Sequence, residues 1–197
     1  GNTSTKAEWL AKPLQRLGYD YFHPDLGYAY ARGEYATPDA AQFPEGLLPL
    51  SHEVCRLGLR LGFWTAPFEV SDRSWIYEHH KDWLVHNAER EPIQIGEGDE
   101  AGKEILFVLD ATKPAAQQYL RATYRTLTRD WAGQYIKLDF MDNTAIEGDY
   151  YRPHTTALEA QRIGLEVIRQ AIGDRVLLDK DGSPMLNPVG IVDEGRL

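Results

Sequence analysis

The segment 135–140, which reads Tyr-Ile-Lys-Leu-Asp-Phe, places a lysine and an aspartate where they could do chemistry. Its alternating hydrophobic residues predict a short, mostly buried strand. Because Lys137 and Asp139 are two residues apart, both side chains point to the same face of that strand. A carboxylate beside a lysine stays ionised near neutral pH and can act as a nucleophile. A structural ion pair at the end of a strand would give the same pattern.

Helical and strand patterns alternate along the chain. Helical spacing is found over 6–17, 48–60, 114–130 and 156–172, and strand-like runs over 19–23, 61–65, 106–109, 135–140 and 176–178. This alternation is typical of a parallel α/β sheet, closed or open. Polar residues lie at or just after the ends of several predicted strands, namely Asp25, Thr65, Asp139 and Asp179. Their position favours a barrel with its site at the C-terminal rim, since no Gly-x-Gly-x-x-Gly follows the first strand to suggest a dinucleotide fold.

Composition excludes several classes of function. A formal net charge of -9 argues against nucleic acid or an anionic membrane as the main partner. No apolar run approaches the roughly 20 residues of a membrane span. The single cysteine, Cys55, excludes an internal disulfide and a cysteine-based zinc site, and its helical context predicts a buried side chain. We expect no cofactor and no required metal. Cytoplasmic and exported locations both stay open.

Five sequence motifs follow one another along the chain. They read FPEGLLPLSHEVCRLGLRLGFWTAPFEVSDRS, HHKDWLVHN, LFVLDATKP, YIKLDFM and DGSPMLNPVGIVDEGRL. In order and spacing they resemble the melibiase group, glycoside hydrolase family 36 and its clan D relatives, over nearly the whole chain. The resemblance implies an α/β fold of the (β/α)8 TIM-barrel type and a retaining α-glycosidase, usually an α-galactosidase.

The resemblance assigns roles to four residues. Asp139 matches the catalytic nucleophile of the family, and Lys137 matches a lysine that contacts the sugar hydroxyls. Trp64 matches a barrel tryptophan near the sugar, although ordinary core packing would also explain it. Arg196 matches an arginine that supports the site, where a fixed guanidinium fork suits carboxylates and hydroxyls.

The chain departs from the family at the segment 24–28. Where the family has an aspartate pair that binds hydroxyls of the terminal galactose, this chain has Asp25 followed by Leu26. The lost carboxylate removes strong charge-assisted hydrogen bonds to the sugar. Asp25 is therefore expected to bind substrate, while the identity of the sugar stays open.

The resemblance also implies an incomplete barrel. Residues 1–197 match about strands 2 to 6 with their helices, so we expect them to be a fragment of one catalytic domain that lacks the first and last barrel strands. The acid/base aspartate of the family would follow Arg196 by about four positions, past Leu197. We therefore expect the fragment alone to be inactive.

The implied function is cleavage of terminal α-linked galactose, or a related sugar, through a covalent glycosyl-enzyme on Asp139. The expected partner is an oligosaccharide or glycan substrate, and a homo-oligomer is possible for the full-length enzyme. Two alternatives stay open. One is transfer of the glycosyl unit to another sugar, and the other is a carbohydrate-binding pseudoenzyme, which Leu26 and the missing proton donor would fit.

Other polar residues have simpler explanations. Asp110 lies between a predicted strand and a predicted helix, which favours a helix N-cap over catalysis. The run 179–181, Asp-Lys-Asp, is interpreted as a solvated turn after a strand, although its place at the rim could also shape substrate choice. Asp142 and Asn143 either touch substrate or begin a turn.

Overall fold

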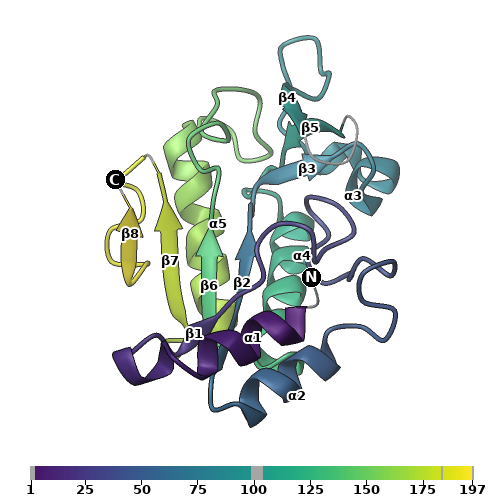
Figure 1. Cartoon of the computed structure of the whole chain (residues 1–197). Helices are drawn as coiled ribbons and strands as arrows, with labels where there is room; N and C mark the ends of the chain where they lie inside the picture. The colour runs from purple at the N-terminus through teal and green to yellow at the C-terminus, as the bar shows by residue number, and fades with distance from the viewer. Residues whose placement is uncertain (1–2, 99–103, 183, 197) are drawn as a thin grey trace.

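The computed structural model describes residues 3–98, 104–182 and 184–196. Its main sheet contains five parallel strands whose spatial order follows the chain (Figure 1). These strands are β1 (Tyr21–Phe22), β2 (Arg60–Thr65), β6 (Tyr135–Leu138), β7 (Leu177–Asp181) and β8 (Glu194–Arg196). Because all five run the same way, their C-terminal ends meet at one edge of the sheet. The described strands form an open sheet and are not closed into a barrel.

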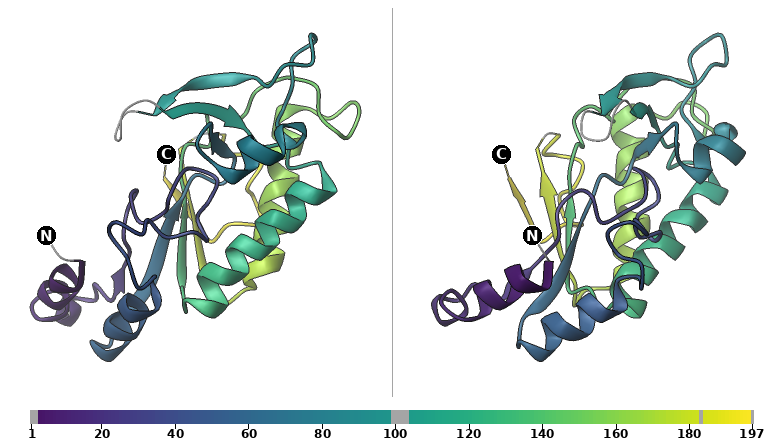
Figure 2. Two further views of the ribbon diagram at one scale, coloured as in Figure 1. Left: turned by 90° about the vertical axis from the view of Figure 1, so that its right-hand side faces the viewer. Right: turned by 45° about the vertical axis from the view of Figure 1, so that its right-hand side comes forward.

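Two of the five described α-helices cover one face of this sheet. The α-helices are α1 (Thr3–Ala11), α2 (Leu48–Arg56), α3 (Trp75–His79), α4 (Pro114–Arg125) and α5 (Ala157–Ile172). Shorter turns of helix are η1 (Gln15–Leu17), η2 (Lys81–Trp83) and η3 (Thr126–Asp130). Helices α4 and α5 lie side by side against the sheet, and the hydrophobic core fills the space between (Figure 2). No helix among the described residues is long and apolar enough to cross a membrane.

A second, antiparallel sheet lies beyond the C-terminal ends of the parallel strands (Figure 1). It contains β3 (Glu69–Ser71), β5 (Glu104–Val108) and β4 (Gln94–Gly98), in that order. The sequence predicts a strand over 106–109 as part of the parallel alternation, and that placement is wrong. The strand exists as β5, but it pairs with β3 and β4 instead of with β2 and β6. Hydrophobicity reports burial and does not specify the pairing partner.

Local backbone chemistry explains where several helices differ from prediction. Pro13 lies inside the predicted helix 6–17, and α1 ends before it because proline cannot donate an intrahelical hydrogen bond. The turn η1 then ends at Gly18, which has a φ of 90°. Glycine adopts this left-handed conformation readily because it has no Cβ atom. Helix α5 begins with a reciprocal capping box between Thr156 and Glu159, which fixes its first turn.

Cys55 is exposed and not buried as predicted, because Val54 takes the inward position on α2.

Gly62 shows how tightly the face of the sheet opposite the helices is filled below the C-terminal rim. A Cβ atom at this position would lie 2.6 Å from Cδ1 of Tyr135 and 3.1 Å from Cβ of His23. Only glycine leaves room for these two rings, whose centroids lie 5.3 Å apart. His23 and Tyr135 therefore form a packed layer beneath the polar residues at the strand ends.

Gly164 provides a test of the packing of α5. A Cβ atom there would lie 2.5 Å from Cζ of Phe68 and 2.9 Å from Cβ of Ala111. Gly164→Ala should therefore lower the free energy of unfolding by about 1–3 kcal/mol through overpacking. Alanine would normally stabilise a helix interior by about 0.5–1 kcal/mol. Urea unfolding measures the difference. The matched control is Gln170→Ala on the exposed face of α5, for which we expect a change within about 0.5 kcal/mol.

Candidate active site

Register places the polar residues of neighbouring strands on one face of the sheet. Trp64 on β2 pairs with Lys137 on β6, and Lys137 pairs with Asp179 on β7. Asp181, at the end of β7, pairs with Arg196 on β8. Side chains alternate along each strand, so these residues share the face that Lys137 occupies. Asp139 directly follows β6 and continues the same alternation. The sheet therefore gathers carboxylates and cations at its C-terminal rim.

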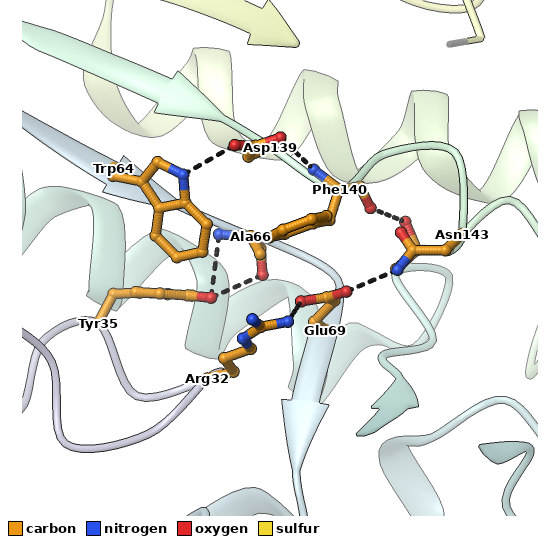
Figure 3. Close-up of polar contacts among 9 residues, drawn as sticks. Arg32, Tyr35, Trp64, Ala66, Glu69, Asp139, Phe140 and Asn143 are labelled. Atoms are coloured by element: carbon orange, nitrogen blue, oxygen red, sulfur yellow. Dashed lines mark hydrogen bonds and ion pairs between the residues drawn. The ribbon is translucent and has the colours of Figure 1, made fainter. Parts of the chain in front are cut away.

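The Asp139 carboxylate is held at both oxygens (Figure 3). Its Oδ2 accepts a hydrogen bond from the indole Nε1 of Trp64 at 2.9 Å, and its Oδ1 accepts one from the backbone N–H of Phe140 at 2.8 Å. Burial opposes its charge, but these two donors and the Lys137 ammonium outweigh burial, so the pKa of Asp139 lies below its ordinary value. The side chain is 21% exposed. Asp139 is thus an ionised carboxylate that solvent can reach.

Lys137 lies between two carboxylates. Its Nζ is 3.4 Å from Oδ2 of Asp139 and 2.9 Å from Oδ2 of Asp181. Burial opposes this charge as well, yet the two carboxylates outweigh it and raise the pKa of Lys137. Arg196 extends the series, because its Nε lies 2.7 Å from Oδ1 of Asp181. Four alternating charges therefore follow one another from β6 through β7 to β8, and they sum to zero.

Aromatic rings enclose Trp64 on two sides (Figure 3). The rings of Tyr35 and Phe140 both meet the indole edge to face, with centroids 6.2 Å and 5.9 Å away. The Tyr35 hydroxyl donates to the carbonyl of Ala66 at 3.0 Å and accepts from its N–H at 2.9 Å, just past the end of β2. These contacts fix the indole ring, and with it the N–H that Asp139 accepts.

A second polar network lies next to Phe140 (Figure 3). Glu69 is fully buried, and its Oε2 lies 2.5 Å from Nη1 of Arg32. Its Oε1 accepts from Nδ2 of Asn143 at 2.8 Å. Burial raises the pKa of Glu69 even though Arg32 and Asn143 favour its charged form. Phe140 itself has a φ of 51°, a left-handed conformation that costs a non-glycine residue on the order of 1–3 kcal/mol.

Comparisons with known proteins place this site in a family. The family model for melibiase matches residues 22–170. The chain belongs to the melibiase family. Alpha-galactosidase 2 of Pediococcus pentosaceus is 26% identical over 158 residues, which are 77% of this chain and 21% of that protein. Alpha-galactosidase AgaA of Geobacillus stearothermophilus is 31% identical over 98 residues, 50% of this chain and 12% of that protein. The chain thus spans about a fifth or less of the length of these relatives.

Solved structures of alpha-galactosidases share the fold. TtGalA from Thermus thermophilus, in complex with stachyose, superposes with a TM-score of 0.78 at 25% identity, covering 98% of this chain and 39% of that one. The crystal structure of AgaA from Geobacillus stearothermophilus gives a TM-score of 0.69 over 91% of this chain and 25% of that one. The predicted membership of the melibiase family and the predicted barrel-type α/β fold are both confirmed, with the described sheet open.

The structure brings together four of the five residues that the sequence singled out. Asp139, Lys137, Trp64 and Arg196 lie in or beside the charge series at the rim. Trp64 is 2% exposed, so it packs in the core and also bonds Asp139. Asp25 forms no ion pair with these residues: it is exposed, and its Oδ1 accepts the N–H of Leu26 at 2.7 Å. Its role in binding a melibiase substrate remains a prediction.

Sequence reasoning missed Asp181. The interpretation of 179–181 as a solvated turn is wrong, because β7 continues to Asp181 and leaves Lys180 only 1% and Asp181 only 2% exposed. The signal was the alternation of Asp179 and Asp181, which repeats that of Lys137 and Asp139 on the neighbouring strand. Two charged strands side by side can neutralise each other, which a single strand viewed alone does not reveal.

Other expectations resolve into structural roles. Asp110 is not the N-cap of α4, since that residue is Lys113. Its Oδ1 accepts the N–H of Thr112 at 2.8 Å and its Oδ2 accepts the N–H of Tyr151 at 2.6 Å, so it braces two loops. Asn143 holds Glu69. Across residues 3–98, 104–182 and 184–196, no group of three or more His, Cys, Asp or Glu side chains could hold a metal ion.

Asp181 offers a direct test of the charge series. Asp181→Asn should lower the pKa of Lys137, because a neutral amide replaces a carboxylate 2.9 Å from its Nζ. NMR titration of the Lys137 side chain measures this change. The control is Asp179→Asn, whose carboxylate accepts from the Tyr135 hydroxyl at 2.7 Å and should lower the pKa of Lys137 by less. Equal shifts in the two variants would contradict the pairing described here.

Proposed function

We propose that residues 1–197 form part of the catalytic barrel of a retaining α-glycosidase that cleaves terminal α-linked galactose or a related sugar. The observation that carries this proposal is the ionised Asp139 carboxylate at the rim of a parallel sheet, held by Trp64, Phe140 and Lys137. Membership of the melibiase family supports it, as do relatives named alpha-galactosidases. Stachyose, bound in the TtGalA structure, is an oligosaccharide of the kind this proposal requires.

Asp139 is the nucleophile in this proposal. One carboxylate oxygen attacks the anomeric carbon, the glycosidic bond breaks, and a covalent glycosyl-enzyme forms. Water then releases the sugar with its original anomeric configuration. The low pKa of Asp139 keeps it ionised for attack, and the hydrogen bonds at both oxygens orient it.

Lys137 has hydrogen-bond donors to offer the sugar. An ammonium group carries three N–H donors, and its ion pairs with Asp139 and Asp181 balance its charge within the protein. An N–H of this group can therefore contact a substrate hydroxyl. With Asp179 beside Lys137, carboxylates outnumber cations on this face, so it suits an uncharged sugar better than an anionic one.

The proton donor requires a carboxyl group outside this set. A general acid must be protonated near neutral pH before it can protonate the leaving oxygen. Asp181 is paired with two cations, and both Glu69 oxygens are bonded in a fully buried position. We propose that the acid/base is an aspartate about four positions after Arg196 in the enzyme, about 5–5.5 Å from Asp139 in the folded protein.

The nucleophile is tested by substitution in the enzyme that contains this chain. Asp139→Asn should lower kcat by at least about a thousandfold, because no other group can form the covalent intermediate. The circular dichroism spectrum should stay that of the parent enzyme. Asp193→Asn, which removes a carboxylate that pairs with Arg169 away from the site, is the control and should retain most of the activity. Near-normal turnover by Asp139→Asn would exclude the nucleophile assignment.

Stereochemistry tests the retaining mechanism separately. ¹H NMR of the first product should show the α-anomer before it mutarotates. In Asp139→Ala, added azide should occupy the vacated space, attack the anomeric carbon and yield the β-glycosyl azide as the leaving group departs. Release of a β-configured sugar by the parent enzyme would show inversion instead.

A panel of nitrophenyl α- and β-glycosides identifies the sugar. We expect cleavage of α-galactosides or of closely related α-glycosides. Cleavage of β-linked sugars alone would overturn the proposal, and sugar binding without cleavage would identify a carbohydrate-binding protein. Products formed with a second sugar present separate hydrolysis from glycosyl transfer.

A further inference from the structure

Phe140 is the strained residue next to the proposed nucleophile. Its φ of 51° lies in the left-handed region, which non-glycine residues rarely adopt. In this conformation its backbone N–H donates to Oδ1 of Asp139 at 2.8 Å. Phe140 is 37% exposed, so burial alone does not hold it. Some other contact must keep the residue in this conformation.

Two contacts do so: the Thr144 hydroxyl donates to the Phe140 carbonyl at 3.2 Å, and Arg32 holds the ring. Its guanidinium carbon lies 4.9 Å from the centroid of the Phe140 ring, a cation–π geometry, while Trp64 packs edge to face on the same ring. Arg32 is only 8% exposed, and its Nη1 ion-pairs with the fully buried Glu69. The guanidinium therefore joins the ring to a fixed anion.

Figure 3 marks two links of this network, from Arg32 to Glu69 and from Glu69 to Asn143. Glu69 on β3 bonds Arg32 with one oxygen and Asn143 with the other. Asn143 lies three residues beyond Phe140 in the same loop. The loop is thus held at its first residue through the ring and at its fourth through the amide, and both contacts lead to Glu69.

We propose that Arg32 is a positioning residue for glycoside cleavage: together with Glu69 and Asn143 it holds Phe140 so that the backbone N–H of Phe140 stays on Asp139. This inference rests on the proposed function. A buried ion pair is often no more stabilising than hydrophobic residues of the same volume. The placement of the guanidinium on the ring that adjoins Asp139 gives this pair a role that a structural bridge does not need.

Loss of Arg32 has a defined consequence. Without the guanidinium, the peptide between Asp139 and Phe140 can flip, which returns Phe140 to an ordinary φ and turns its N–H away from Asp139. The ionised form of Asp139 then loses one of its donors, so its pKa rises. The acidic limb of kcat/KM must move to higher pH, because the carboxylate has to be ionised to attack. A misaligned nucleophile lowers kcat more than it raises KM.

The experiment compares Arg32→Gln and Arg32→Lys with the parent enzyme. Arg32→Gln should lower kcat by about 10- to 100-fold, with a change in KM below about threefold and an acidic limb shifted to higher pH. Arg32→Lys keeps a positive charge beside Glu69 but lacks the planar guanidinium on the Phe140 ring. It should therefore show the same shift of the acidic limb. An unshifted limb in both variants would overturn the proposal.

Arg169→Gln is the matched control. Arg169 also ion-pairs with a carboxylate, that of Asp193 at 2.6 Å, but it lies on α5 away from Asp139. Its loss should lower the melting temperature without moving the acidic limb. A shift equal to that of Arg32→Gln would mean that general destabilisation moves the limb, and would overturn the role of Arg32.

A double-mutant cycle tests the route through Phe140. Glycine adopts a φ of 51° without strain and has no ring to hold, so Phe140→Gly uncouples the backbone from Arg32. Adding Arg32→Gln to Phe140→Gly should change kcat by less than about twofold. If the two effects multiply instead, Arg32 does not act through Phe140.

A readout without substrate separates this inference from the proposed function. The amide proton shift of Phe140 should follow the titration of Asp139, because the two groups are hydrogen-bonded. In Arg32→Gln that titration should move to higher pH or disappear from the amide signal. If the parent enzyme cleaves no glycoside, the proposed function fails, and this titration alone decides whether the network holds Asp139.

Discussion

The need to neutralise charges on a half-buried face governs this structure. Lys137 and Asp139 share one face of β6, where neither charge could remain without a partner. Their mutual pairing leaves one side of the lysine free, and Asp181 on the next strand occupies it. Asp181 in turn needs a second cation, which Arg196 supplies. Each charge in the series pairs with a neighbour of opposite sign, and the series therefore spans three strands.

The parallel sheet makes this series possible. In-register parallel pairing puts Lys137 beside Asp179 and Asp181 beside Arg196, and Lys137 also reaches Asp181 at 2.9 Å. Side chains from distant parts of the chain therefore meet within ion-pair distance. Gly62 lets His23 and Tyr135 fill the layer below, which keeps the charges at the rim instead of deeper in the sheet. The scaffold thus determines where the carboxylates lie, and the side chains determine which of them stay ionised.

Features with a local cause could be predicted from the sequence. The alternation over 135–140 identified β6 and the shared face of Lys137 and Asp139, and the spacing over 156–172 identified α5. Features with a distant cause could not. The end of β7 depends on its pairing with β6 and β8. The pairing of β5 with β3 cannot be predicted from the amino-acid composition of β5. Arg32 and Glu69 lie 37 residues apart in the chain, and neither has a local pattern that points to the other.

Three deviations from local rules lie around Asp139. Each of these three features is unfavourable by itself: the positive φ of Phe140, the full burial of Glu69 and the near-complete burial of Asp181. Natural sequences are mostly consistent from local to global level, and departures concentrate where function requires them. Here Phe140 donates to one Asp139 oxygen, Glu69 anchors the group on the Phe140 ring, and Asp181 holds the lysine beside the other oxygen. Because all three unfavourable features lead to the same carboxylate, its orientation is the simplest common reason for keeping them.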